Sequence, residues 1–148
     1  MRTVALEEHF SVPALAMIPA EHLLGRGNPA FAQGAEIMKD GSKYLSELGA
    51  SRIADMDSAG ITVQVLSWSG PGADILPPDE SVPWAREVND HLAGFIGERP
   101  DRYAGFEHLP MTALQAAADE LERCVRALGL KGAMVNGTTD GKFLDDPL

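Results

Sequence analysis

The stretch Ile61-Thr62-Val63-Gln64-Val65-Leu66-Ser67 decides the fold. It is nearly all apolar around Gln64, which is the pattern of a strand in a parallel sheet that is covered on both faces. Gly60 stands directly before it, at the C′ position of a predicted helix whose apolar residues recur at helical spacing from 44 to 59. A helix that leads into a buried strand is typical of parallel α/β proteins.

The same alternation extends to both sides of this strand. Upstream, Val4–Phe10 begins with β-branched and aliphatic residues and is predicted to be a short strand. Downstream, Ser81 is the predicted N-cap of a helix over 82–99, and Tyr103–Leu109 is the next predicted strand. The strands and helices therefore alternate on each side of the central segment.

One more helix and one more strand follow. Thr112 is predicted to cap a helix that ends at Gly129, and Lys131–Asn136 is the fourth predicted strand. The predicted apolar face of this helix consists of Leu114, Ala117, Ala118, Leu121, Val125 and Leu128. The order is β, long excursion and helix, β, α, β, α, β, which implies parallel strands joined by right-handed crossovers.

A long irregular excursion separates the first strand from the first long helix. Three prolines and four glycines interrupt residues 11–41, where 14–24 is the place for one short helix. Loops of this length in compact domains are usually functional. We therefore treat 1–148 as a single domain with an insertion at about 11–41.

Two architectures fit four such units: a small open doubly wound sheet, or half of a (β/α)₈ barrel. The sequence has no Gly-x-Gly-x-x-Gly after the first strand and no Gly-x-x-x-x-Gly-Lys-Ser/Thr, which removes the usual nucleotide-binding reasons for an open sheet. The chain also stops in a loop behind the fourth strand, as a fragment would. Pattern alone does not choose between the two architectures.

Charge and composition exclude some partners. There are 22 acidic residues and 12 Lys and Arg residues, and the net charge of −10 repels phosphate backbones while it tolerates metal cations. Cys124 is the single cysteine, so there is no internal disulfide, and we expect a reducing compartment and a structural thiol. The apolar stretch at Met1–Leu6 is too short for a signal sequence or a membrane span. We expect a cytoplasmic protein without nucleic-acid or membrane partners.

Charged residues gather at the carboxyl end of the first strand. Strict alternation places Ala5, Glu7 and His9 on one face, with Leu6, Glu8 and Phe10 on the other. A carboxylate and an imidazole on one face of a strand end can ligate one divalent cation such as zinc or manganese. Glu-x-His is common in proteins, so a solvated strand end with two acids is the alternative interpretation.

The opening strand, 4–10, resembles that of the amidohydrolase-2 family, which contains the γ-resorcylate, 2,3-dihydroxybenzoate and aminocarboxymuconate-semialdehyde decarboxylases. Further stretches resemble the family in the same order along the chain. These are Arg52–Ile61, Val65–Ser67, Arg99–Tyr103 with Leu109-Pro110, and Glu120–Gly137. The resemblance thus spans essentially the whole chain, and the nearest named members are the γ-resorcylate and 2,3-dihydroxybenzoate decarboxylases.

The resemblance implies a metal-dependent (β/α)₈ barrel of which this chain covers about the first four strands. Glu7 and His9 match the family's first two metal ligands, which implies one divalent ion, Zn or Mn, at the carboxyl ends of the strands. The family's later ligands are a histidine on the fifth strand and an aspartate on the eighth, and this aspartate also handles the proton. Both lie beyond Leu148, so we assign no catalytic residue within the chain.

Three other residues are candidates for substrate binding. Trp68 could form a wall at the end of the second strand, although packing is the common role of such a residue. His108 or its neighbour Glu107 could line the site, because they point to opposite faces of the third strand. Asn136 could donate amide hydrogen bonds to a ligand or cap its own loop. His22, in the excursion, is a further candidate, whereas His91 is expected at the surface or in packing.

The expected function is the non-oxidative decarboxylation of a small (hydroxy)aromatic carboxylic acid. A metal-dependent hydrolase of the same superfamily is the first alternative, because the residues that discriminate the two would lie beyond Leu148. A truncated, non-catalytic half-barrel that self-associates is the second, because strands one and four would be open edges. A small carboxylic acid substrate and a homo-oligomer are the expected partners.

Overall fold

The computed structural model describes residues 1–15, 44–68 and 71–146. Their order of elements agrees with the predicted alternation of strands and helices. The elements are β1 (Val4–Phe10), α3 (Ala50–Ser58), β2 (Val63–Trp68), η1 (Ala73–Ile75), α4 (Pro78–Glu98), β3 (Tyr103–Gly105), β4 (Glu107–His108), α5 (Leu114–Arg123), η2 (Cys124–Leu128) and β5 (Ala133–Met134). The short helix predicted over 14–24, His22 and most of the excursion lie outside the described residues.

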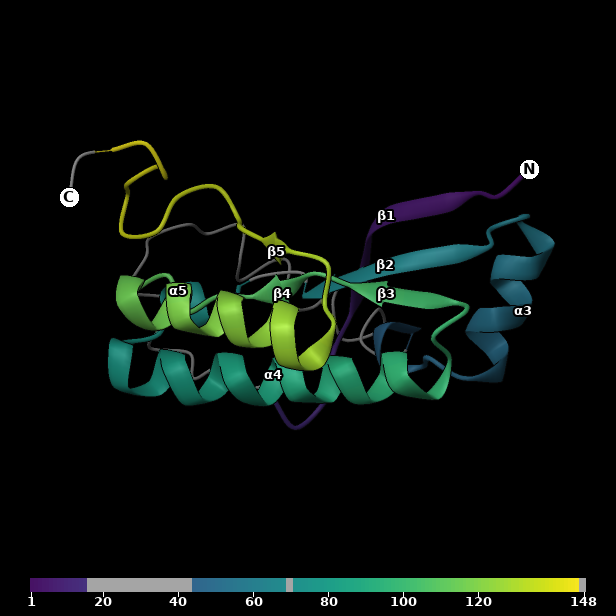
Figure 1. Cartoon of the computed structure of the whole chain (residues 1–148), viewed down its shortest axis with the longest axis horizontal. Coiled ribbons are helices and arrows are strands. Elements are labelled where there is room, and N and C mark those ends of the chain that lie inside the picture. Colours follow the sequence, from purple (N-terminus) through teal and green to yellow (C-terminus); the bar gives the residue numbers. More distant parts are fainter. Residues whose placement is uncertain (16–43, 69–70, 147–148) are drawn as a thin grey trace.

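The strands run parallel and form a three-stranded sheet and a two-stranded sheet (Figure 1). β2 lies between β1 and β3, and β4 pairs with β5. The predicted strand Tyr103–Leu109 is divided at Phe106, because its first part pairs with β2 and its second part with β5. The Phe106 N–H still donates to Leu66 O at 2.9 Å, and the Glu107 N–H donates to Gly132 O at 2.9 Å. The strand partner of the chain therefore changes from β2 at Phe106 to the segment leading into β5 at Glu107.

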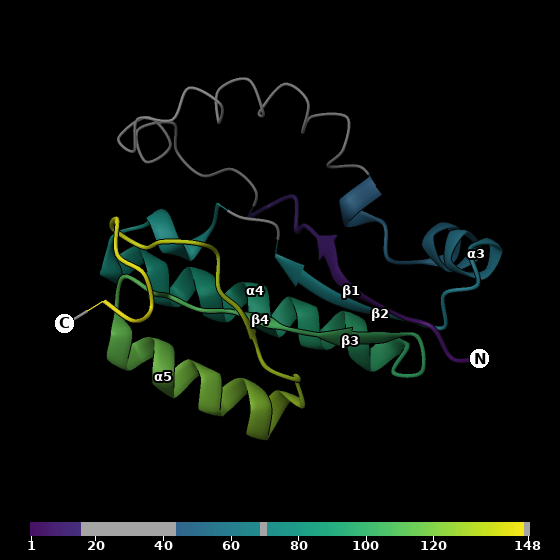
Figure 2. The same ribbon diagram turned by 90° about the horizontal axis from the view of Figure 1, so that it is seen from above.

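Helices α4 and α5 lie on the same side of these strands and run back against them (Figures 1 and 2). The hydrophobic core fills the space between strands and helices. It consists of Phe10, Val12, Leu48, Met56, Leu66, Trp68, Val88, Leu92, Tyr103, Cys124 and Leu130. All strands point their carboxyl ends toward the end of the molecule where η1, α4 and α5 begin (Figure 1). In such an arrangement, functional side chains belong at this end.

Helix α4 begins four residues earlier than the predicted start at Val82. Pro77 is its N-cap and Pro78 its first residue, where the fixed proline φ suits a helix and no N–H is missed. Ser81 is therefore not the cap. It lies inside the first turn, with a buried hydroxyl group that has no hydrogen-bond partner among the described residues.

Two predictions about helix α5 are also wrong. Ala113 is the N-cap, without a side-chain hydrogen bond, and the hydroxyl group of Thr112 is buried without a partner in the described part of the chain. The buried face is offset from the predicted one, because Ala117, Glu120 and Cys124 face inward. By contrast, Leu114, Leu121 and Val125 are 50%, 37% and 45% exposed.

The remaining boundaries differ by a few residues. β2 begins at Val63 rather than Ile61, and β5 is limited to the middle of the predicted strand 131–136. Gly60 and Gly129 adopt the left-handed conformation, with φ of 68° and 73°, where their helices end as predicted. None of the helices in the described ranges is long and apolar enough to cross a membrane.

Candidate functional site at the carboxyl ends of the strands

A bulge in β1 determines where its charged side chains lie. Ala5 pairs with Gln64 and Glu8 pairs with Leu66, so β1 has one residue more than β2 between these positions. Because Gln64 and Leu66 share a face of β2, Ala5 lies on the face of Glu8 and not on that of His9. The predicted grouping by strict alternation is wrong for Ala5 because it did not foresee the bulge.

Glu7 stands in the bulge itself. Its φ of 58° is in the left-handed region, which is uncommon for a residue with a side chain and often marks a functional position. The side chain is exposed, and the described residues provide no hydrogen-bond or ion-pair partner for its carboxylate. Glu7 therefore offers an unpaired carboxylate near the carboxyl end of β1.

Glu8 instead belongs to a network on the helix side of the sheet. Its carboxylate accepts a hydrogen bond from the Gln64 amide at 3.0 Å and lies 3.8 Å from the Arg52 guanidinium. Arg52 also donates to Gln64 Oε1 at 2.7 Å and to the backbone oxygen of His9 at 2.9 Å. Glu8 is thus engaged by α3 and β2, and Arg52 fixes the backbone at the end of β1.

His9 is half-buried on the opposite face from Glu8. Its Nδ1 lies 3.4 Å from the hydroxyl oxygen of Ser67, its register partner on β2, and Ser67 is completely buried. No partner for the other ring nitrogen is found within the described ranges. A histidine held by one ring nitrogen and open at the other is the usual arrangement of a metal ligand.

The described residues supply only part of a metal site. Within residues 1–15, 44–68 and 71–146, no group of three or more His, Cys, Asp or Glu side chains is arranged to hold a metal ion. Glu7 and His9 are two donors, and zinc or manganese requires more. These two residues fit the first half of a coordination sphere.

Trp68 is buried, with 5% of its surface exposed, at the carboxyl end of β2. Its indole N–H donates to Pro71 O at 3.1 Å. Its ring packs edge to face against Phe10 and Trp84, with centroid distances of 5.8 and 4.9 Å. In this structure the packing contacts of Trp68 thus come from the core and from α4.

The neighbours Glu107 and His108 are both buried in β4. The His108 ring packs against Trp84 at a centroid distance of 5.5 Å, and its Nε2 accepts the Ala73 N–H at 3.0 Å. Both carboxylate oxygens of Glu107 are buried and have no hydrogen-bond partner in the described part of the chain. Burial, with a smaller contribution from the charge of Glu120, raises the pKa of Glu107 to about 7.

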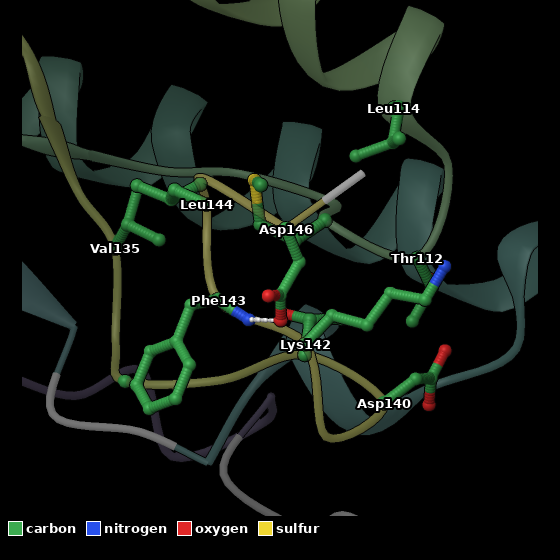
Figure 3. Close-up of a pocket in the computed structure, with 11 residues that line it drawn as sticks. Thr112, Leu114, Val135, Asp140, Lys142, Phe143, Leu144 and Asp146 are labelled. Atoms are coloured by element: carbon green, nitrogen blue, oxygen red, sulfur yellow. Dashed lines mark hydrogen bonds between the residues drawn. The ribbon is translucent and has the colours of Figure 1, made fainter. Parts of the chain in front are cut away.

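Asn136 follows β5 and keeps a buried amide nitrogen for which the described residues offer no partner. The residues on either side of it, Val135 and Gly137, line a pocket of about 240 Å³. Figure 3 shows the Lys142 side chain extending along this pocket, while Phe143 donates its N–H to Asp146 at 2.8 Å. An unsatisfied amide beside a pocket suits contact with a polar ligand.

Several residues of this region were not singled out from the sequence. Ser67 is recognisable only through its register with His9, which depends on the bulge. Trp84 lies between Trp68 and His108 and packs against both rings. The sequence feature that could have identified it is an indole with a polar N–H on the packed face of a helix. Asn89, a polar residue between the buried apolar positions of α4, exchanges two hydrogen bonds with the backbone of His108. His91 is exposed on α4.

Comparison with known proteins identifies relatives of this fold. The sequence profile of the amidohydrolase family matches residues 14–148. Gamma-resorcylate decarboxylase from Rhizobium sp. is 36% identical over 135 residues, covering 90% of this chain and 38% of the relative. The enzyme of the same name from Rhodococcus jostii is 34% identical over 143 residues, with 96% and 40% covered. The chain thus spans about two fifths of the length of these curated relatives.

Solved structures agree. The 2,6-dihydroxybenzoate decarboxylase from Rhizobium has a TM-score of 0.74 and 35% identity, with 93% of this chain and 39% of that chain covered. The 5-carboxyvanillate decarboxylase from Sphingomonas paucimobilis has a TM-score of 0.88 and 26% identity, with 99% and 46% covered. The expectation of a partial (β/α)₈ barrel is confirmed.

Proposed function

The chain belongs to the amidohydrolase family, and from that premise we propose that it is the amino-terminal part of a metal-dependent, non-oxidative decarboxylase of a small hydroxylated aromatic acid. The relatives that support this proposal are decarboxylases of γ-resorcylate, which is the same compound as 2,6-dihydroxybenzoate. The net charge of −10 also suits a protein that binds a cation rather than a phosphate backbone.

The observation that carries the proposal is the pairing of His9 with Ser67. A buried hydroxyl group at Nδ1 restrains the orientation of the imidazole ring and leaves Nε2 as the nitrogen that would bind a metal ion. Glu7, on the same strand, adds an exposed carboxylate. A neutral imidazole and a carboxylate oxygen form a donor set that suits zinc or manganese. A solved decarboxylase of this group from Polaromonas contains bound manganese.

We assign Glu7 and His9 as two ligands of one divalent ion, Mn or Zn. When bound, such an ion polarises the carboxylate and the adjacent hydroxyl group of a substrate and stabilises the negative charge that develops on the ring. Ser67 keeps the His9 ring in place, and Arg52 holds the backbone at the end of β1. The remaining ligands and the residue that gives a proton to the ring carbon would come from later strands of the barrel.

Asn136, Trp68 and His108 are the proposed substrate-site residues of this chain. The amide nitrogen of Asn136 is buried and has no hydrogen-bond partner among the described residues, which leaves it able to donate to a polar substituent of the ring if a ligand reaches it. Trp68 supports the site from its core side, because its ring is packed into the core. We further propose that the complete protein is cytoplasmic and forms a homo-oligomer.

Metal binding tests the assignment without any need for activity. The chain and its variants Glu7→Gln and His9→Gln are titrated with Mn²⁺, and Glu8→Gln is the matched control because Glu8 faces Gln64 and Arg52. Both ligand variants are expected to lose about tenfold or more in affinity, and Ser67→Ala roughly tenfold. The control should stay close to the unchanged chain. Equal affinities for Glu7→Gln and Glu8→Gln would refute the assignment.

The reaction is tested on the whole product of the gene that encodes this chain. With 2,6-dihydroxybenzoate and Mn²⁺, equal amounts of resorcinol and CO₂ are expected. Cleavage of an ester or amide without CO₂ would favour the hydrolase alternative. Absence of any metal-dependent turnover of either substrate class would favour the non-catalytic half-barrel.

A further inference from the structure

His108 makes a hydrogen bond that identifies which of its ring nitrogens is the acceptor. Its Nε2 lies 3.0 Å from the backbone nitrogen of Ala73, and an amide N–H only donates, so Nε2 carries no proton. A neutral ring then carries its proton on Nδ1, which is buried without a partner among the described residues. The ring is 3% exposed, so water does not compete for these atoms.

The backbone of His108 is fixed just as firmly. Its N–H donates to Asn89 Oδ1 at 2.9 Å, and its carbonyl oxygen accepts from Asn89 Nδ2 at 3.0 Å. The same Nδ2 also donates to Glu120 Oε1 at 2.9 Å. These hydrogen bonds attach β4 to the middle of α4 and thereby fix the position of the His108 backbone relative to that helix.

The loop that connects β2 to α4 is fitted closely around this ring. A Cβ atom on Gly72 would lie 2.6 Å from His108 Nε2 and 2.9 Å from the Trp84 ring, so only glycine fits there. The Gly72 N–H donates to Asp74 Oδ1 at 2.8 Å. Asp74 Oδ1 also lies 3.6 Å from His108 Nε2, so a proton on Nε2 would pair with this carboxylate and release the Ala73 N–H.

Two routes connect His108 to Trp68. Through the backbone, Ala73 is bound to His108, and Pro71, two residues earlier, accepts the Trp68 indole N–H at 3.1 Å. Through the rings, His108 packs on Trp84 and Trp84 packs on Trp68, at centroid distances of 5.5 and 4.9 Å. The two routes surround Gly72 and link both residues 71–73 and the Trp68 ring to His108.

We propose that His108 is a positioning residue, which accepts the Ala73 N–H through an unprotonated Nε2 and thereby fixes residues 71–73 and the Trp68 ring at the carboxyl end of the barrel. A role for this wall in binding an aromatic substrate rests on the proposed function. The hydrogen bond and its effect on the loop do not.

Two variants of similar size separate this role from simple packing. His108→Gln can place an acceptor oxygen near the Nε2 position, whereas His108→Asn reaches only the Nδ1 position. Amide hydrogen exchange of Ala73 in the purified chain is expected to be roughly tenfold to hundredfold faster in His108→Asn, because a buried donor loses its acceptor. His108→Gln is expected to restore most of the protection.

Two spectroscopic measurements complete the test. The ¹⁵N shifts of the His108 ring should show a protonated Nδ1 and an unprotonated Nε2. The near-ultraviolet circular dichroism of Trp68 and Trp84, the only two tryptophans, should change in His108→Asn and be retained in His108→Gln. A protonated Nε2, or equal Ala73 exchange in both variants, would overturn the proposal.

The kinetic consequence is assayed separately in the whole gene product. If the proposed function is right, His108→Asn should raise KM more than it lowers kcat, since the wall would bind the ring of the substrate and not its reacting carbon. If His108→Asn speeds Ala73 exchange but no decarboxylation is found for the unchanged protein, the proposed function fails and the positioning role stands. If decarboxylation is found while both variants protect Ala73 equally, the positioning role fails and the proposed function stands.

Discussion

Glu107 and Glu120 interact inside the protein, but their surroundings are opposite. Neither carboxylate oxygen of Glu107 has a hydrogen-bond partner in the described part of the chain. Glu120 accepts hydrogen bonds from Asn89, Arg86, Arg123 and Cys124. Burial alone would raise the pKa of Glu120, but the hydrogen bonds from Arg123 and Asn89 hold it below its usual value. The pKa values of the two carboxyl groups are therefore shifted in opposite directions, upward for Glu107 and downward for Glu120.

This relationship predicts how stability depends on pH. The pKa of Glu107 is raised from 4.5 to about 7 in the folded chain. The protonated Glu107 carboxyl group contributes fully to the free energy of unfolding below about pH 4.5. This contribution is lost as pH rises through about 7, and the total loss in unfolding free energy is about 3 kcal/mol. Glu107→Gln removes the ionisation, so this loss should be missing from the variant. Urea unfolding of both proteins across this range gives the comparison.

The contribution of Glu120 to the pH profile has the opposite sign. Its stabilisation is present above its unfolded pKa and fades as pH falls through the lowered folded value. Because Glu120 is the same in both proteins, the difference between wild type and Glu107→Gln isolates Glu107. A difference that stays constant from about pH 5 to about pH 8 would show that Glu107 does not titrate in this range.

The buried network around Glu120 should be far more sensitive than an exposed ion pair on the same helix. Glu120 is 1% exposed and lies 2.7 Å from Arg123, so Glu120→Ala would remove the buried acceptor that Asn89 and Arg123 share. We expect a loss of roughly 3 kcal/mol in unfolding free energy. Glu122→Ala is the control, because its pair with Arg126 is solvent-exposed and should contribute less than about 0.5 kcal/mol. Similar losses in the two variants would contradict this ranking.

The order of strands and helices was predictable from the sequence because hydrophobic periodicity is a local property. The positions of Gly60 and Gly129 were predictable for the same reason, since a helix C-terminus demands a left-handed residue. The division at Phe106 was not predictable. It depends on pairing with two different strands, because Tyr103–Gly105 pairs with β2 and Glu107–His108 pairs with β5. These partners are distant in sequence, so a local sequence pattern does not identify them.

The buried face of α5 was mispredicted for a related reason. Apolar spacing favours Leu121 and Val125, but Glu120 is buried instead because partners from α4 and α5 neutralise it. For the candidate site, Glu7 and His9 are predicted as metal ligands from the strand pattern together with the resemblance to a family. The role of Ser67 required the register that follows the β1 bulge. Side-chain partners that are distant in sequence therefore account for most of what was missed.

The thiol of Cys124 should be inert in the folded chain. It is completely buried, and burial together with its hydrogen bond to Glu120 at 3.3 Å raises the pKa of this thiol. Since the thiolate is the reactive form, a disulfide reagent such as dithionitrobenzoate should react very slowly with the native protein and quickly in denaturant. Rapid reaction without denaturant would show that η2 opens readily from the core.

Substitution of Gly72 provides a last contrast between two glycines of the same region. Gly72→Ala forces a Cβ atom within 3 Å of both His108 and Trp84, and both rings are held by their own packing. A loss of about 1–3 kcal/mol in unfolding free energy is expected, as for overpacking in a core. Gly94→Ala, in α4, meets nothing within 4 Å and should stabilise the helix by about 1 kcal/mol. Thermal unfolding of the two variants should therefore shift in opposite directions, and a tolerated Gly72→Ala would mean that the loop moves away from His108 at little cost.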